Sequence, residues 1–178
     1  MHKASRSHSS GIEMPIAPQF LTSQISEFAK QIARVPSHIK EQQLSELESF
    51  LFELEESRLY PYDFVIYRVS GFRLEGSVHI NMLGSALIND VVAAIAVVSR
   101  TMDIDAGDTL TLSEVAVDCG VSKRTINRLR HEGLPFIWVT EPSSKRRLGC
   151  RKSQLIKFKK TRENRIVNAS IFSRLSDI

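Results

Sequence analysis

The stretch TLSEVAVDCGVSKRTINRLRHEGLP, residues 111–135, decides the fold that the sequence predicts. Thr111 and Glu114 have the Thr-x-x-Glu spacing of a capping box, in which each side chain binds a backbone N–H that has no partner at a helix start. We therefore expect a helix to begin near Leu112. Gly120 ends this helix, because glycine readily adopts the positive φ that a sharp turn needs.

A second short helix is predicted after the glycine turn. Ser122 is a suitable N-cap for it, and Gly133 ends it. Two short helices around such a turn pack closely, which requires a small residue on the first helix and apolar residues on the second. The predicted contact positions are Val115, Ala116, Cys119, Gly120, Val121, Ile126 and Leu129. Their spacing predicts a helix-turn-helix.

The outer face of the second helix carries the candidate binding residues. Once Ile126 and Leu129 face inward, polar and basic side chains are left on the opposite face. Arginine can make a bidentate contact to guanine and asparagine to adenine, whereas lysine mostly holds phosphate. We therefore predict that double-stranded DNA is bound by Ser122, Lys123, Arg124, Asn127, Arg128 and His131. The alternative is a solvated basic helix without a ligand.

A β-hairpin is predicted after the second helix. The segments FIWVT (136–140) and RRLGC (146–150) can form its strands, and EPSSK (141–145) is a turn sequence. Three consecutive cations follow the turn and repel one another, which favours a nearby anion. We expect these side chains in solvent, on a wing that contacts the DNA backbone or minor groove: Lys145, Arg146 and Arg147.

The C-terminal part of the chain is strongly basic. Residues 121–178 contain 15 Lys and Arg and 4 Asp and Glu, a net charge of +11, whereas residues 1–120 contain 9 and 16, a net charge of −7. A helix predicted over 151–165 places four cations outward, and Lys157 and Lys160 are the candidate phosphate contacts. A basic block also suits an anionic membrane or an acidic protein, so charge alone does not choose the partner.

The N-terminal half is predicted to be mostly helical. Apolar residues recur at helical spacing over 20–33, 37–57 and 83–100. We interpret the glutamates of the second helix as a solvated face: Glu41, Glu46, Glu48, Glu53, Glu55 and Glu56. The segment YPYDFVIYRVSGFR (60–73) is rich in aromatic and β-branched residues and is predicted to be extended. The polar run DIDAGD (103–108) is predicted to be a linker.

The sequence therefore predicts a mainly α protein, with an N-terminal helical unit that includes a short extended segment, followed by a winged helix-turn-helix. Its 178 residues suit two small units. The expected parts are a flexible leader over 1–19, an acidic helical domain over 20–105, a DNA-binding domain over 109–165 and a basic tail over 166–178.

Other classes of protein are less favoured by the sequence. No carboxylate cluster, Cys/His pair or Gly-rich phosphate loop stands at catalytic spacing, so we expect no enzyme, no catalytic residue and no cofactor. Cys119, His131 and Cys150 are residue types that can bind zinc, but Cys119 falls on an apolar face and His131 on a polar one, so no metal is predicted.

The cellular setting is also an expectation from sequence. The apolar segment 80–99 is interrupted by Asn81, Asn89 and Asp90, which favours a buried helix over a membrane span. The two cysteines form no Cys-x-x-Cys pair, and the N-terminus lacks the apolar stretch of a secretory signal. These features predict a cytoplasmic protein with no membrane contact.

Two resemblances extend these predictions. The order of helix, glycine turn, VSKRTINRLRHEGLP, hairpin with KRR and short helix resembles the excisionase and MerR-like winged helix-turn-helix family over about residues 109–160. The segments YPYDFVIYRVSGFR, LTLSEVAVDCGVSKRTINRLRHEGLP, RRLGCRKSQLIKF and FSRLSD are similar to the N-terminal portion of planctomycete RNA polymerase sigma factors and sigma-like proteins, over about residues 36–177.

The second resemblance implies a role in transcription, with RNA polymerase as a further partner, although the polymerase-binding and promoter-melting regions of such proteins are lacking here. The alternative is a protein interaction module, in which the acidic helical unit docks on a partner and the basic end supplies solubility. A third class, an enzyme acting on nucleic acid, has no catalytic motif to support it.

Overall fold

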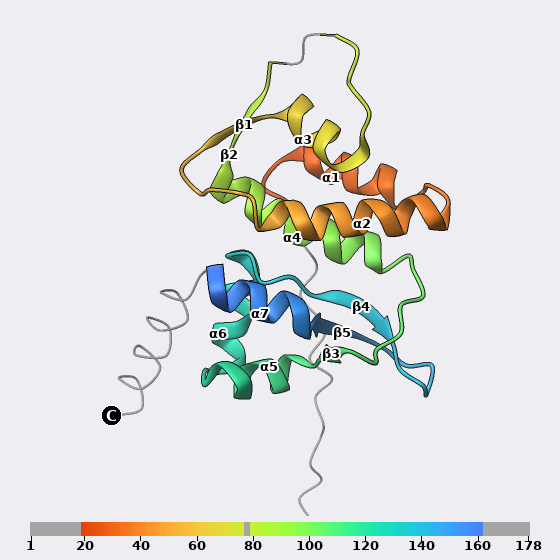
Figure 1. Cartoon of the computed structure of the whole chain (residues 1–178), viewed down its shortest axis with the longest axis vertical. Helices are drawn as coiled ribbons and strands as arrows, with labels where there is room; N and C mark the ends of the chain where they lie inside the picture. The colour runs from red at the N-terminus through yellow and green to blue at the C-terminus, as the bar shows by residue number, and fades with distance from the viewer. Residues whose placement is uncertain (1–18, 77–78, 162–178) are drawn as a thin grey trace, which may run out of the picture.

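The computed structural model describes residues 19–76 and 79–161, and the chain is mainly α (Figure 1). The N-terminal half consists of α1 (Ser23–Ile32), α2 (Ser37–Leu51), β1 (Leu59–Pro61), α3 (Tyr62–Ser70), β2 (Asn81–Leu83) and α4 (Gly84–Ser99). The C-terminal half consists of β3 (Thr109–Leu110), α5 (Leu112–Cys119), α6 (Lys123–His131), β4 (Ile137–Thr140), β5 (Arg146–Arg151) and α7 (Lys152–Thr161).

Helix α4 is the centre of the N-terminal half and packs against both α1 and α2. The apolar residues predicted to be buried on this helix are all inaccessible to solvent: Leu87, Val91, Ala94, Ile95 and Val98. Asp90 is also buried, and its carboxylate accepts hydrogen bonds from the backbone N–H groups of Leu21 (2.7 Å) and Thr22 (2.9 Å). The carboxylate thereby holds the start of α1 on α4.

Among the described residues, no helix is long and apolar enough to cross a membrane.

The prediction that residues 60–73 are extended is wrong. Only β1 is extended, pairing antiparallel with β2, and the chain then turns into α3. Pro61 precedes this helix, and Gly71 ends it at φ 74°. Val65, Ile66 and Val69 are buried at helical spacing, so packing against α2 outweighs the strand propensity of these β-branched residues.

The interpretation of the glutamates over 41–56 as a solvated face holds for Glu41, Glu53, Glu55 and Glu56, which are exposed, and is wrong for Glu48. Glu48 is buried, and its Oε1 accepts a hydrogen bond from Nε of Arg151 at 3.1 Å. Glu46 and Glu53 both pair with Arg68 of α3. The acidic side of α2 therefore holds its neighbours through ion pairs, because α3 and the end of β5 bring arginines to it.

Helices α5 and α6 begin and end as predicted. Thr111 Oγ1 accepts from the Glu114 backbone N–H (3.2 Å), and Glu114 Oε2 accepts from the Thr111 N–H (2.7 Å), which completes the capping box. Gly120 follows α5 at φ 65°, and the Ser122 side chain accepts from the backbone N–H of Thr125. The core between these helices includes Val115, Ala116, Cys119, Ile126 and Leu129.

The C-terminal sheet has the strand order β3-β5-β4 and is antiparallel. The β4–β5 hairpin was predicted, but its packing was not. Phe136 belongs to the core under α5 and α6, whereas Ile137 and Val139 belong to the core of the N-terminal half. The hairpin thus fastens the two halves together. Its apolar residues pack against the N-terminal half, on the other side of the linker predicted at 103–108.

Candidate nucleic-acid interface

The exposed side of α6 is the one predicted from its sequence. Ile126 and Leu129 are fully buried, while Lys123, Arg124 and Arg128 are exposed. Arg128 Nε lies 3.7 Å from a carboxylate oxygen of Glu132, a surface pair worth about 0–1 kcal/mol. Because this ion pair is weak, Arg128 can bind another anion in place of Glu132 at little cost in free energy. The structure therefore gathers these three cations on one accessible surface.

Arg130 was not predicted as a site residue, yet it sets the orientation of Asn127. Arg130 is half-buried, its guanidinium lies 5.2 Å from the centroid of the Phe136 ring, and its Nη1 donates to Asn127 Oδ1 at 3.2 Å. Burial lowers the pKa of Arg130. Arg130 lies beside the apolar face of α6, and Phe136, which it contacts, comes from beyond this helix. The sequence of the helix alone therefore does not indicate the contact.

His131 lies against α4. Asn89 Nδ2 donates to the Gln19 carbonyl (3.0 Å) and to Asp90 Oδ1 (3.1 Å), so its Oδ1 is the acceptor that faces the imidazole. The 2.9 Å contact is therefore a hydrogen bond from His131 Nδ1–H to Asn89 Oδ1. This bond joins the end of α6 to α4, which separates His131 from the other residues predicted on this helix.

The expectation that the three hairpin cations lie in solvent holds for Lys145 and Arg146, which are exposed, and is wrong for Arg147, which is half-buried. Lys145 is exposed at the turn. Although exposed, Arg146 is bound: its Nη1 donates to the carbonyl of Arg100 (2.6 Å), the residue that follows α4, and its Nη2 donates to that of Met102 (3.0 Å) in the segment after the helix. Both Arg146 and Arg100 also lie over the Trp138 ring.

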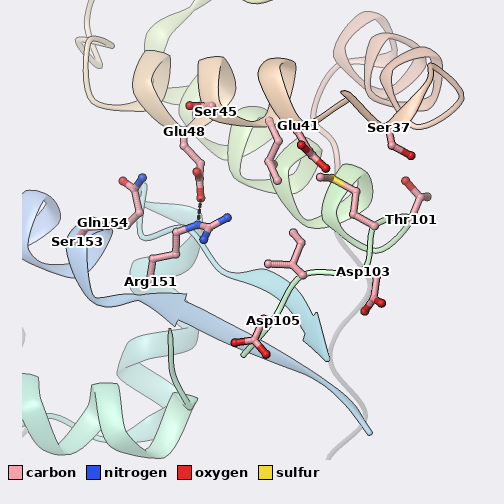
Figure 2. A pocket seen from close by; sticks show the side chains of 13 residues that line it. Ser37, Glu41, Ser45, Glu48, Thr101, Asp103, Asp105, Arg151, Ser153 and Gln154 are labelled. Atoms are coloured by element: carbon pink, nitrogen blue, oxygen red, sulfur yellow. Dashed lines mark hydrogen bonds and ion pairs between the residues drawn. The ribbon is translucent and has the colours of Figure 1, made fainter. Parts of the chain in front are cut away.

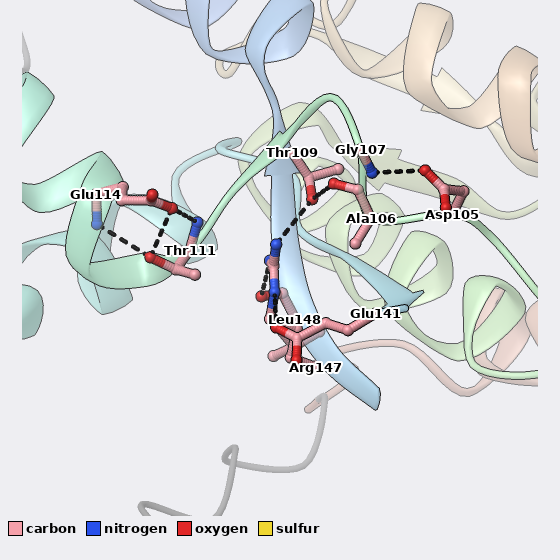
Figure 3. A network of polar contacts seen from close by, with 9 residues as sticks. All are labelled: Asp105, Ala106, Gly107, Thr109, Thr111, Glu114, Glu141, Arg147 and Leu148. Carbon is pink, nitrogen blue, oxygen red and sulfur yellow. Dashed lines mark hydrogen bonds and ion pairs between the residues drawn. The ribbon is translucent and has the colours of Figure 1, made fainter. Parts of the chain in front are cut away.

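Arg147 is held inside a polar network that joins the hairpin to β3 (Figure 3). Its Nε donates to Glu141 Oε1 at 2.8 Å, and its Nη2 donates to Thr109 Oγ1 at 3.3 Å. Thr109 Oγ1 in turn donates to the carbonyl of Ala106 at 2.6 Å. Arg147 therefore contributes to the structure of the sheet. Of the three hairpin cations, only Lys145 has no such structural contact among those described above.

Arg146→Ala is expected to destabilise the protein by about 2 kcal/mol, because charge-assisted hydrogen bonds to the carbonyls of Arg100 and Met102, just after α4, and a cation–π contact are lost together. Urea denaturation followed by circular dichroism measures this change. Lys145→Ala, at the exposed neighbour, is the matched control and should stay within about 0.5 kcal/mol of the parent protein. Equal stability of both variants would contradict the capping role.

Helix α7 presents Lys157 and Lys160 to solvent, as predicted. Lys159 instead forms an ion pair with Asp118, which fastens α7 to α5. Figure 1 shows α6 and α7 toward one end of the C-terminal half, which is the lower part of the view, and the hairpin turn at the other end. Arg162, the fourth cation predicted to face outward, lies outside the described residues, as do the predicted basic tail and nearly all of the predicted leader.

The cysteines are part of the core. Cys119 and Cys150 are both buried, and burial raises the pKa of each thiol, that of Cys150 to about 12. Within residues 19–76 and 79–161, no group of three or more His, Cys, Asp or Glu side chains is placed to hold a metal ion.

Comparison of the chain with protein-family models, with curated proteins and with solved structures finds no match.

Proposed function

We propose that the protein binds double-stranded DNA sequence-specifically and acts in transcription, with α5, α6 and the β4–β5 hairpin forming a winged helix-turn-helix. The observation that carries this proposal is the outer face of α6. Three exposed cations lie on a short helix whose start is capped and whose inner face is fully buried. A rigid helix with this face has the dimensions and the chemistry to enter a major groove.

The roles of the side chains follow from their chemistry. Arg124 and Arg128 can each make a bidentate contact to guanine, and Asn127, held by Arg130, can contact adenine. Lys123 is suited to phosphate, as are the exposed lysines of α7. The Ser122 hydroxyl caps α6 and can also donate to a phosphate. On the hairpin, Lys145 is the cation best placed to reach a second part of the duplex.

RNA polymerase is proposed as a further partner, on the resemblance to sigma-like proteins. A protein interaction module is the second candidate function, and a patch on the N-terminal half favours it. Phe64, Tyr67 and Phe72 are between 43% and 71% exposed on α3 and just after it. Large exposed apolar side chains in one region are typical of protein-binding surfaces. The two functions are compatible, because this patch and α6 lie in different halves of the chain.

The full-length protein is expected to bind a duplex selected from random sequences, and its affinity should fall steeply with salt. Each neutralised phosphate contributes about −0.9 to the slope of log K against log salt. Arg128→Ala should weaken binding to the selected site by about 5- to 150-fold and relax the preference at one base pair. Fluorescence anisotropy at several salt concentrations measures both effects.

Arg34→Ala is the matched control, because Arg34 is an exposed arginine that follows α1 in the other half of the chain. This variant should bind the selected duplex like the parent protein. A salt slope near zero would overturn the proposal of DNA binding. Equal weakening by Arg128→Ala on every sequence would show that Arg128 contacts phosphate and that bases are read elsewhere.

A further inference from the structure

A pocket of about 740 Å³ lies between the two halves of the chain (Figure 2), and its described lining includes no residue of α6. One wall is α2, the second is the segment 101–105, and the third is the junction of β5 and α7. The volume falls in the range of small-molecule sites. Helix α2 and the β5–α7 junction are far apart in sequence, so the pocket exists only in the folded chain.

The lining of the pocket is predominantly acidic. Glu41 and Glu48 come from α2, and Asp103 and Asp105 come from the facing segment. Arg151 is the single cation among the described lining residues, and it is bound to Glu48. Arg151 offsets the charge of Glu48, and Asp105 Oδ1 accepts a hydrogen bond from the Gly107 N–H at 2.7 Å, so the net negative charge of the lining comes from Glu41, Asp103 and Asp105. The pocket therefore favours a cationic ligand and disfavours an anionic one.

Apolar side chains lie between the carboxylates. Leu44 of α2 and Met102 and Ile104 of the facing segment line the same space. An apolar surface bounded by charged groups suits a ligand in which methylene groups separate the cationic ends, because the chain can bury apolar area while its ends stay paired. A compact hydrated metal ion would make no use of this surface.

Gln154 provides an independent indication of a ligand with N–H donors. It lines the pocket, is only 7% exposed, and its Oε1 has no hydrogen-bond partner among the described residues. A buried acceptor without a donor costs about 1–3 kcal/mol. The last torsion of a glutamine side chain is soft, so the amide can rotate to accept a hydrogen bond from a donor in the pocket.

We propose that this pocket binds an aliphatic diamine or polyamine. Its ammonium groups pair with Glu41 and with Asp103 or Asp105, its methylene groups lie on the apolar side chains, and one N–H group supplies the donor that Gln154 lacks. The proposal concerns a second site and does not rest on DNA binding. Its test contains no nucleic acid, so the failure of one proposal is distinguishable from the failure of the other.

Isothermal titration calorimetry of the full chain with putrescine and with spermidine tests the site. We expect saturable binding of one ligand per chain. Glu41→Gln should weaken this binding about tenfold, through loss of a charge-assisted contact. Gln154→Met preserves the volume of the side chain and removes the orphan acceptor, so it should weaken binding several-fold without lowering the melting temperature.

Glu75→Gln is the matched control, because it makes the same charge change at an exposed residue outside the pocket lining, and it should leave the affinity unchanged. The neutral isostere 1,6-hexanediol should not bind. Absence of saturable binding would overturn the proposal. Equal weakening by Glu75→Gln, or full displacement by equimolar Mg²⁺, would also overturn it, because either result would indicate general attraction to an acidic surface.

Discussion

Ile126→Asp is expected to unfold the C-terminal half of the protein and, with it, to abolish the proposed DNA binding. The Ile126 side chain is completely buried between α5 and α6, so the variant places a carboxylate where no water or cation reaches it. We expect a loss of about 4 kcal/mol or more, a large part of the 5–15 kcal/mol that stabilises a typical domain. Guanidinium denaturation, followed by the fluorescence of the single tryptophan, Trp138, measures this loss.

Val117→Asp is the matched control, since it introduces the same charge at a position of α5 that is 82% exposed. Its free energy of unfolding should change by no more than about 0.5 kcal/mol. Ile126→Val separates packing from charge and should cost about 1 kcal/mol. If Ile126→Asp and Val117→Asp proved equally stable, the inward orientation of Ile126, and with it the assignment of the DNA-binding face, would be wrong.

Gly84→Ala is expected to cost about 3 kcal/mol, although alanine normally favours a helix. A Cβ atom at this position would lie 1.8 Å from the backbone oxygen of Glu55. The Gly84 N–H also donates to the Arg58 carbonyl at 2.8 Å, which anchors the start of α4 on the segment between α2 and β1. Backbone atoms cannot rotate aside as a side chain can, so α4 must move away and lose this hydrogen bond. Thermal and urea denaturation measure the effect.

Ser85→Ala is the control for Gly84→Ala, because it adds no atom and lies in the same first turn of α4, on the surface. Its stability should stay within about 0.5 kcal/mol of the parent protein. Gly120→Ala gives a second comparison. Nothing lies within 4 Å of its added Cβ, so it should cost only about 1–2 kcal/mol for a positive φ. A Gly84→Ala variant as stable as Ser85→Ala would contradict the close approach of α4 to Glu55.

The sequence predicted those features that depend on neighbouring residues. The capping box of Thr111 with Glu114, the turn at Gly120 and the cap at Ser122 are all present in the structure. Each involves groups within four residues of one another, so the local sequence contains both partners. The exposed face of α6 was predictable for the same reason, since helical periodicity alone separates Ile126 from Arg128.

The sequence was misleading where distant elements supply the partner. Arg146 is exposed, as its pattern predicts, but the segment just after α4, more than 40 residues earlier, provides carbonyls that bind it. Glu48 has the pattern of a solvated glutamate, but it is buried with Arg151, 103 residues away. Likewise, aromatic and β-branched residues predicted an extended segment over 60–73, but packing on α2 favours a helix over 62–70.

The sequence by itself thus determined the mainly α composition, the capped helix pair α5–α6, the hairpin and the basic face of α6, because short-range periodicity and capping chemistry specify them. Only the tertiary structure decided which charges remain available. It engaged Arg146 and His131 in contacts between the two halves and Arg147 in the polar network of the C-terminal sheet, left Lys123, Arg124 and Arg128 exposed, and formed the acidic pocket beside Arg151. The physical reason is that a charged side chain lies wherever an oppositely charged or polar group offsets its desolvation, and that group can come from any part of the chain.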